Sequence, residues 1–246
     1  MAPRTRRPRP PVHAATVNAV TDLSPRVRCI RLSAPDLVGT EWQPGQKIKI
    51  KVADWLRSYT PARVDAVDGW MDVVFFLHGN GSASQWAASA QVGEPIQYVG
   101  PSKSVSAAQG EPAWALFLGD ESTIGLATAL MESLPAAVQK LGAIELDAVD
   151  VPSLEAFGLP LDPAIRCGEH GDALQGWLRE VALPGGEGVV WVSGEALAAR
   201  GLRESLMQRK PDGVQFHLKA YWSSRGHAHR KALEQEQAAE AAKADE

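Results

Sequence analysis

A strand, a glycine-rich loop and a helix start follow one another in the segment Asp72-Val-Val-Phe-Phe-Leu-His78-Gly-Asn-Gly81-Ser82-Ala-Ser84. The apolar run before His78 is typical of a β-strand, and the two glycines allow the backbone to approach a ligand closely. The free N–H groups at the start of a helix suit a diphosphate. An ordinary glycine-rich turn capped by a serine has the same residues. The segment therefore predicts either a phosphate-binding loop or a plain turn.

A second polar group lies upstream, at Arg57-Ser-Tyr-Thr60, and ends in Pro61. Arg57 offers a planar fork for a phosphate. Tyr59 is two residues further along a strand, so it shares a face with Arg57 and presents a ring for stacking. Thr60 adds a hydroxyl for a ring nitrogen. Alone the tetrapeptide is weak evidence. Together with the later helix start at Ser82–Ser84, whose N–H groups could bind a phosphate, it indicates a ligand with a planar ring and phosphates.

Two halves of the chain differ in pattern. Short runs rich in branched residues, at 12–20, 26–33, 46–52 and 70–77, are separated by Pro and Gly and predict a small antiparallel β-barrel. One helix, at 84–90, interrupts them. From residue 114 onwards strands and helices alternate, which predicts a parallel sheet with helical crossovers. The expected strands are 114–118, 144–151, 189–192 and 214–221, and the expected later helices include 172–183 and 196–208.

Composition limits the class of protein. The 246 residues carry a net charge of −4, too mild for a nucleic-acid partner, which would need a basic stripe. No apolar run has the length of a membrane span, and Cys29 and Cys167 form neither a disulfide framework nor a metal cluster. We expect a protein of the reducing cytoplasm with no metal site. His227 and His229 are more consistent with an exposed tail than with a metal site.

The motifs together resemble the siderophore-interacting protein family, flavin-dependent ferric reductases of the ferredoxin–NADP reductase superfamily. Besides the two segments above, the resemblance rests on Gln85-Trp86, Gly119-Asp-Glu-Ser122, Trp191-Val-Ser-Gly-Glu195 and Tyr221-Trp222. It implies an FAD-binding β-barrel domain at 12–108 and an NAD(P)H-binding α/β domain at 112–224. We expect a flexible basic arm at 1–11 and a polar, helical tail at 225–246.

The resemblance also implies roles for particular residues. Tyr59 would lie against the isoalloxazine of FAD, Thr60 near its N5 and Arg57 near the phosphates. The loop Gly119–Ser122 would border the nicotinamide. The full set of expected cofactor contacts is Arg57, Ser58, Tyr59, Thr60, His78, Gly79, Gly81, Ser82, Ala83, Ser84, Gly119, Asp120, Glu121, Ser122, Gly194 and Glu195.

Three departures from the family pattern bear on these roles. Ser82 stands where the family usually has Pro, and serine is also compatible with a helix start. The run Gly119-Asp-Glu-Ser-Thr-Ile-Gly125 replaces a Gly-Asp-Glu-Thr-Ala-Leu-Pro pattern and puts the pyridine-nucleotide contacts in question. The run Tyr221-Trp-Ser-Ser-Arg-Gly226 shifts a basic residue, which affects the choice of substrate or electron donor.

The implied activity is reduction of the Fe(III) of a ferric siderophore by NADPH or NADH through FAD. Fe(II) binds the same hard oxygen ligands far more weakly, so reduction releases the metal. The flavin carries the redox chemistry, so the sequence predicts no protein nucleophile or general base as a catalytic residue. Arg200 and Arg203 are candidates for a 2′-phosphate contact, or else lie on a solvated helix face.

Many ferric siderophores are anionic, so a positive site is expected for the substrate. Lys47, Lys49 and Lys51 alternate with aliphatic residues and share one strand face. That face lies either beside the flavin or on the solvated outside of the barrel. Arg225 would add positive charge if the tail folds back.

Three alternatives keep part of this interpretation. The chain could reduce free flavin or serve as the reductase component for another acceptor, although such proteins often carry a cysteine-rich iron–sulfur module. It could be a siderophore-binding protein without redox activity, which would not need the flavin motifs. It could also retain FAD but take electrons from a ferredoxin.

Overall fold

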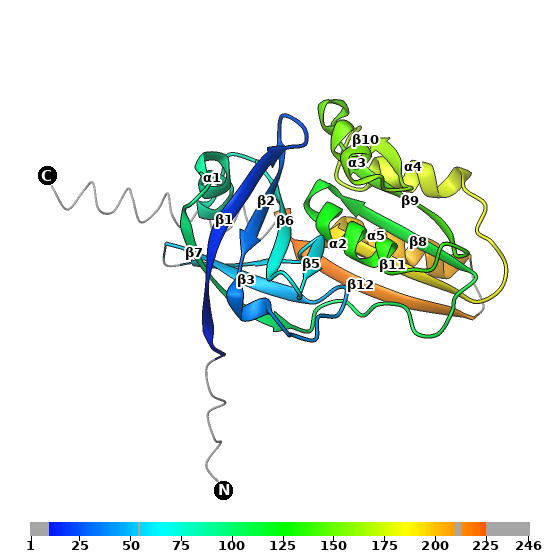
Figure 1. The fold of residues 1–246 in the computed structure, drawn as a ribbon. Helices are drawn as coiled ribbons and strands as arrows, with labels where there is room; N and C mark the ends of the chain where they lie inside the picture. Colours follow the sequence, from blue (N-terminus) through cyan, green and yellow to red (C-terminus); the bar gives the residue numbers. More distant parts are fainter. Residues whose placement is uncertain (1–9, 54, 210–212, 225–246) are drawn as a thin grey trace, which may run out of the picture.

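Two sheets organise the computed structural model, which describes residues 10–53, 55–209 and 213–224 (Figure 1). The first has seven strands in the order β4-β3-β7-β1-β2-β6-β5, and its neighbouring strands are antiparallel. The second has five strands in the order β10-β9-β8-β11-β12, and its neighbours are parallel. The predicted fold class, an antiparallel β-domain followed by a parallel α/β domain, is confirmed.

The antiparallel sheet precedes the parallel one in the chain. Its strands are β1 (Val12–Asp22), β2 (Val27–Ser33), β3 (Lys47–Val52), β4 (Trp55–Tyr59), β5 (Arg63–Asp65), β6 (Trp70–Phe76) and β7 (Pro95–Ser102). A 3₁₀ turn (Pro35–Leu37) follows β2, and α1 (Ser82–Ser89) lies between β6 and β7.

The sheet encloses a hydrophobic core because its strands alternate. In β3, Ile48 and Ile50 are fully buried while Lys49 and Lys51 are exposed, as a period of two requires. Residues of six strands or helices meet in this core, among them Ala15, Ile30, Ile50, Val73, Ala87 and Tyr98. Figure 1 shows α1 beside the upper part of β1, and Ala83 and Ala87 of this helix are buried in the same core.

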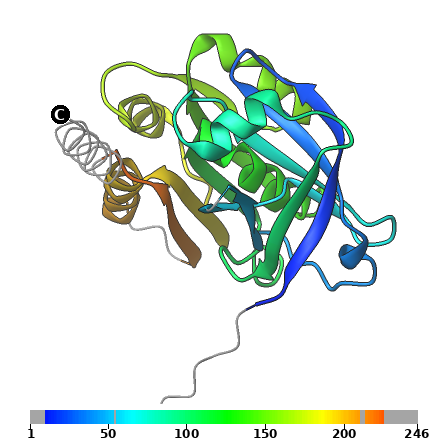
Figure 2. The ribbon, with the colours of Figure 1, turned by 90° about the vertical axis from the view of Figure 1, so that its left-hand side faces the viewer.

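The parallel sheet is covered by helices on both faces. Its strands are β8 (Trp114–Asp120), β9 (Gln139–Leu146), β10 (Asp162–Ile165), β11 (Gly188–Glu195) and β12 (Val214–Trp222). The helices are α2 (Ile124–Glu132), α3 (Pro152–Phe157), α4 (Asp172–Glu180) and α5 (Ala196–Gln208), with 3₁₀ turns at Glu121–Thr123 and Ala148–Asp150. Figure 2 shows α5 and β12 on the opposite side of the molecule from β1.

The two helix layers have separate cores. Leu126 of α2 and Leu154 of α3 pack on one face of the sheet, and Leu174 of α4 and Leu202 of α5 pack on the other. Residues of β8 and β11 are buried along their whole length, as expected of central strands covered on both faces.

One hydrophobic cluster joins the two sheets. Val27 of β2 and Val74 of β6 lie in the same cluster as Phe117 of β8 and Ile124 of α2 (Figure 1). This explains why β6 is buried on both faces: alternate residues enter the barrel core, and Val74 faces the α/β domain.

Three ion pairs reinforce the same junction: Arg26 with Asp147 and with Asp150, and Arg63 with Glu132. Arg26, between β1 and β2, donates from Nε to Asp150 Oδ2 at 2.9 Å and also contacts Asp147. Ser24 Oγ donates to the other oxygen of Asp150 at 2.7 Å. Arg63 of β5 donates to Glu132 of α2 at 3.0 Å. These contacts link the segments around β1, β2 and β5 to α2 and to the 3₁₀ turn after β9.

Some sequence-based boundaries were wrong. The strand expected at 144–151 is β9, which runs from Gln139 to Leu146. Its start was missed because Gly142 lacks an apolar side chain; a Cβ there would lie 2.0 Å from Phe117 O, so only glycine fits. The strand β7 and the short elements β5, β10 and α3 were not predicted.

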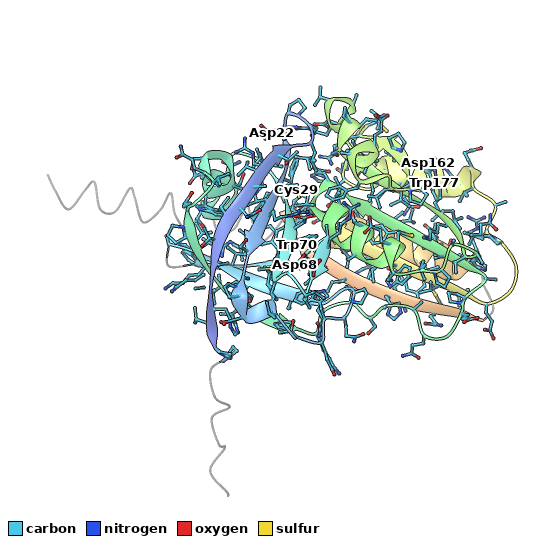
Figure 3. The ribbon with its side chains drawn as sticks, viewed as in Figure 1. Asp22, Cys29, Asp68, Trp70, Asp162 and Trp177 are labelled. Carbon is cyan, nitrogen blue, oxygen red and sulfur yellow. The ribbon has the colours of Figure 1, made fainter. Side chains whose placement is uncertain are left out.

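Figure 3 shows side chains of both sheets. Trp177 of α4 lies beside Asp162 of β10 and donates from its indole nitrogen to that carboxylate at 2.7 Å. Cys29 lies on β2, within the antiparallel sheet and far from this pair. No helix among the described residues combines the length and apolar character needed to cross a membrane.

Candidate functional site

The segment Arg57-Ser-Tyr-Thr60 spans the end of β4, an edge strand of the antiparallel sheet. Arg57 pairs with Ile50 of β3, and Tyr59 pairs with Ile48, so both side chains lie on the barrel-core face of the sheet. Tyr59 packs on Phe75 with ring centroids 4.5 Å apart. Burial, opposed by the charge of Arg57, raises the pKa of Tyr59 to about 12, so it is a neutral phenol at physiological pH.

Thr60 lies where the two domains meet. It is 5% exposed, and its hydroxyl forms a hydrogen bond with the hydroxyl of Tyr221 from β12. On the other side, a Cβ added to Gly125 of α2 would lie 2.8 Å from Thr60 O, so glycine permits this close packing. Thr60 therefore contacts the first helix and the last strand of the α/β domain.

A pocket of ≈ 200 Å³ opens beside Tyr59 and Thr60. Its walls come from both domains and consist of Lys47, Ser58, Tyr59, Thr60, Ser104, Lys219, Ala220 and Tyr221. Ligand pockets usually measure about 300–1,000 Å³, so this one suits one end of a cofactor or substrate and not a whole dinucleotide.

The pocket is positively charged. Lys47 of β3 and Lys219 of β12 both line it, and neither forms an ion pair with a carboxylate among the described residues. Burial, and then the charges of Lys219 and Lys49, lower the pKa of Lys47. Two ammonium groups that repel each other without a counter-ion favour an anionic ligand.

The three predicted substrate lysines do not gather at this pocket. Lys47 lines it, whereas Lys49 and Lys51 are exposed and pair with Ser58 and Leu56, whose side chains alternate with Arg57 and Tyr59. Lys51 Nζ donates to Gln97 Oε1 at 3.3 Å. A substrate role for Lys49 and Lys51 stays a prediction. Arg225 lies outside the described residues.

The loop before α1 has the backbone geometry that its glycines predict. Gly79 has φ 76° and Gly81 has φ 85°, the left-handed region that favours glycine. The Ser84 hydroxyl accepts from Gly79 N at 3.2 Å and fixes the loop against the helix. His78 lies at the start of the loop, where its Nδ1 accepts from Asn80 N at 3.3 Å.

The N-terminus of α1 has no side-chain cap and no acidic residue in its first turn. Its N-cap is Gly81, which has no side chain to bond the first amides, and Ala83 is buried beneath them. Ser82 Oγ is buried and has no hydrogen-bond partner among the described residues. An unpartnered hydroxyl at an uncapped helix start fits a phosphate oxygen. These residues, together with Arg57, fit the diphosphate of FAD.

The loop Gly119–Ser122 lies at the carboxyl end of β8, where the strand order reverses toward β11. Ligands of open α/β sheets bind at such a switch point. Gly119 is required there because a Cβ would lie 2.2 Å from Thr123 Oγ1. Asp120 Oδ1 accepts from Ser122 N at 3.0 Å, and Asp120 Oδ2 accepts from Glu195 N at 2.8 Å and from Trp222 Nε1 at 2.9 Å.

Glu121 forms a buried ion pair with Arg166, which follows β10. Glu121 is 4% exposed, and burial, with the charge of Asp120, raises its pKa to about 7 in spite of Arg166. Arg166 Nε is itself buried without a hydrogen-bond partner among the described residues. This carboxyl therefore titrates near neutral pH at the carboxyl end of β8.

Glu195 caps its own helix. Its carboxylate accepts from Leu197 N at 2.6 Å and Ala198 N at 3.1 Å, and from Ser224 N at 3.0 Å. Burial opposes ionisation, but these hydrogen bonds outweigh it and lower the pKa of Glu195. Gly194 (φ 119°) must be glycine, because a Cβ would lie 2.5 Å from Asp120 Oδ2. Unlike α1, helix α5 therefore offers no free amide pair at Leu197 and Ala198 to a nucleotide phosphate.

Four of the pocket residues were not predicted as site residues from the sequence: Ser104, Lys219, Ala220 and Tyr221. Lys219 and Tyr221 are two residues apart on β12 and therefore share a strand face, a signal that the sequence contained. Ser104 gave no such signal.

The sequence offered Arg200 and Arg203 as candidates for a 2′-phosphate contact. Arg200 is exposed on α5, and the guanidinium carbon of Arg203 lies over the ring of Phe216, 5.7 Å from its centroid. Among the described residues, no group of three or more His, Cys, Asp or Glu is placed to hold a metal ion. His227 and His229 lie outside them.

Comparison with known sequences identifies both parts of the chain. The model of the siderophore-interacting FAD-binding domain matches residues 51–105, and that of the siderophore-interacting protein matches residues 112–225. An uncharacterized protein of Mycobacterium tuberculosis is 34% identical over 159 residues, 58% of this chain and 55% of that protein. The aligned part of the chain thus spans about half the length of that relative.

A named relative and a solved structure agree with these matches. The NADPH-dependent ferric-chelate reductase of Escherichia coli is 26% identical over 171 residues, 69% of this chain and 66% of that protein. The crystal structure of a siderophore utilization protein from T. fusca superposes with a TM-score of 0.72 at 25% identity, covering 87% of this chain and 93% of that one. The two family models match strands of both sheets, and the chain belongs to the siderophore-interacting protein family.

Proposed function

We propose that this protein binds FAD and uses NADPH or NADH to reduce the iron of an anionic ferric siderophore, releasing Fe(II) from the chelator. One NAD(P)H carries two electrons, so two ferric ions are reduced and one proton is released for each NAD(P)H oxidised. Two free cysteines are consistent with the reducing cytoplasm as the place of reaction.

The observation that carries the proposal is the pairing of two unlike sites around Tyr59. On one side, Arg57 and the uncapped N-terminus of α1 with its unpartnered Ser82 Oγ suit a diphosphate. On the other side, the pocket with Lys47 and Lys219 suits an anion. Bound FAD would accept the two electrons of the hydride together and pass them on one at a time, as iron requires.

The remaining roles belong to the protein side chains. Tyr59 offers a neutral ring for stacking, and Thr60 offers a hydroxyl whose direction Tyr221 fixes. Lys47 and Lys219 would attract the anionic chelate to the pocket beside Tyr59. Asp120 accepts from Glu195 N and so joins the carboxyl ends of β8 and β11, where a nicotinamide would bind.

A ferredoxin as electron donor is a second candidate, because Glu195 occupies the amides of α5 that a pyridine-nucleotide phosphate would use. Reduced ferredoxin would then bleach the flavin while NADPH and NADH would not. The acceptor and the flavin stay the same in this variant of the proposal.

The test uses the purified full-length chain. We expect a yellow protein whose visible flavin absorbance disappears anaerobically on addition of NADPH or NADH and returns on addition of a ferric siderophore. A chromogenic Fe(II) chelator would record the released metal. Arg57→Ala combined with Tyr59→Ala should remove the cofactor, while Leu56→Ala, on the opposite strand face, should keep it. A colourless protein that does not bind added FAD would refute the proposal.

A further inference from the structure

An exposed tryptophan opens the strand that carries Arg57 and Tyr59. Trp55 is the first residue of β4 and is 55% exposed, although burial of an indole is strongly favourable. The β3–β4 hairpin does not cover it. We propose that Trp55 is the stacking platform for the adenine ring of FAD, an inference that rests on the proposed function.

The register of β4 supports this role. Trp55, Arg57 and Tyr59 are two residues apart and pair with Val52, Ile50 and Ile48 of β3, so the three side chains share one face. Leu56 and Ser58 lie on the opposite face. Because β4 is an edge strand, its outer side has no neighbouring strand, which leaves room for a ligand along it.

The order of these side chains matches the order of groups in FAD. In the cofactor, the isoalloxazine is followed by the ribityl chain, the diphosphate, the ribose and the adenine. Along the strand, Tyr59 provides the stacking ring, Arg57 the phosphate contact and Trp55 a second ring. Residues on one face of a strand are about 7 Å apart, a spacing that one sugar or polyol linker spans.

Arg57 also links the two halves of this arrangement. Its guanidinium carbon lies 5.1 Å from the centroid of the Trp55 ring, a cation–π contact. Among the described residues Arg57 has no carboxylate partner, and its Nη1 donates only to Leu56 O at 3.3 Å. The indole thus holds the guanidinium beside the place where the diphosphate ends and the adenosine begins, while most of the ring stays open for a base.

The experiment compares two flavins that differ in the adenosine half. The affinities of flavin-free, full-length protein for FAD and for FMN, which lacks the adenosine monophosphate group, are measured by quenching of flavin fluorescence. A base stacked on an aromatic side chain contributes about 1–3 kcal/mol. Trp55→Ala should therefore weaken FAD binding by about 5- to 150-fold and leave FMN binding within about twofold.

Two further variants sharpen the result. Trp55→Phe should recover part of the FAD affinity, because it restores a stacking ring. Leu56→Ala removes an exposed apolar side chain from the same strand on the other face and should change neither affinity. Circular dichroism of each variant records that the fold is kept.

Three outcomes would overturn the inference. Unchanged FAD affinity in Trp55→Ala would exclude a stacking role, and an equal loss of FAD and FMN affinity would show that Trp55 only shapes β4. Both results leave the proposed function standing, because the parent protein still binds FAD. A parent protein that binds neither flavin would overturn the inference and the proposed function together.

Discussion

The hydroxyls of Thr60 and Tyr221 are hydrogen-bonded to each other across the domain junction, although 161 residues separate them in the chain. Tyr221 comes from the last strand of the parallel sheet and Thr60 from the segment that follows β4. Burial raises the pKa of Tyr221 to about 12, in spite of its bond to Thr60, so its proton stays in place at physiological pH. A side chain of the second domain therefore borders the candidate flavin site.

Because the two hydroxyls bond each other, the effects of substitutions at Thr60 and Tyr221 should depend on each other. We expect Tyr221→Phe to lower the free energy of unfolding by about 0.5–1.5 kcal/mol, the usual contribution of a neutral hydrogen bond. Thr60→Val should do the same, and the double variant should lose less than the sum of the two. Urea unfolding of all four proteins measures this coupling. Strictly additive losses would show that the two hydroxyls do not depend on each other.

The junction should depend strongly on Asp150. This carboxylate is fully buried and accepts from Ser24 and Arg26 of the other domain. Asp150→Ala would remove the buried acceptor of Ser24 and Arg26, and hydrogen bonds to a charged group typically contribute about 1.5–3 kcal/mol. The matched control is Asp147→Ala, which removes the more exposed partner of Arg26 and should cost less than about 1 kcal/mol. Similar losses in the two variants would contradict the role assigned to Asp150.

Stability should vary with pH through Glu121. Its pKa is raised from 4.5 to about 7, so the folded protein holds a proton that the unfolded chain has released. The stabilisation of the protonated form is complete below about pH 4.5 and is lost as the pH rises through about 7. Glu121→Gln removes this titration, so the free energy of unfolding should decline less between these pH values than in the parent. Parallel pH curves for the two proteins would exclude Glu121 as the titrating group.

The cysteines should not take part in the reaction. Burial, and then the charge of Asp72, raise the pKa of Cys29 to about 12, so its thiol is protonated at neutral pH. Cys167 is exposed. Iodoacetamide should modify Cys167 in the folded protein and spare Cys29. Replacement of both by Ser should leave ferric reduction within severalfold of the parent, and an abolished rate in a folded, flavin-loaded variant would reveal a thiol step.

Local signals in the sequence account for much of the fold and for half of the site. The alternation of Lys49 with Ile48 and Ile50 predicted β3 and its two faces, because burial on one side of a strand imposes a period of two. The glycines around Asn80 predicted the loop before α1, because its backbone needs positive φ. These features depend on neighbours in the chain and can be read from a short window.

What the sequence did not indicate depends on contacts between distant segments. Lys219 meets Lys47 only because β12 packs against the end of β3 and β4, and no local pattern encodes that contact. Glu195 was expected to contact a nucleotide, yet its carboxylate bonds the amides of its own helix. A Gly-Glu pair before a helix is compatible with both arrangements, so only the side-chain conformation distinguishes a cap from a ligand contact.

The charged pocket leads to a prediction about substrate charge. Lys47 and Lys219 should draw an anionic ferric chelate to Tyr59, and exposed charges more than about 10 Å away are screened at 0.1 M salt. Lys47→Ala and Lys219→Ala should each raise the KM for an anionic ferric siderophore several-fold at low salt, with a smaller effect at high salt. The KM for a neutral ferric chelate, and the rate at which NAD(P)H bleaches the flavin, should stay within about twofold.

Lys140→Ala, at the far end of the parallel sheet, is the matched control for loss of one positive charge. Lys49→Ala tests the strand face expected from the sequence: an effect as large as that of Lys47→Ala would extend the site along β3. Equal effects of Lys47→Ala on anionic and neutral chelates would mean that the variant loses flavin or stability and not attraction, and the charged pocket would then have no part in choosing the substrate.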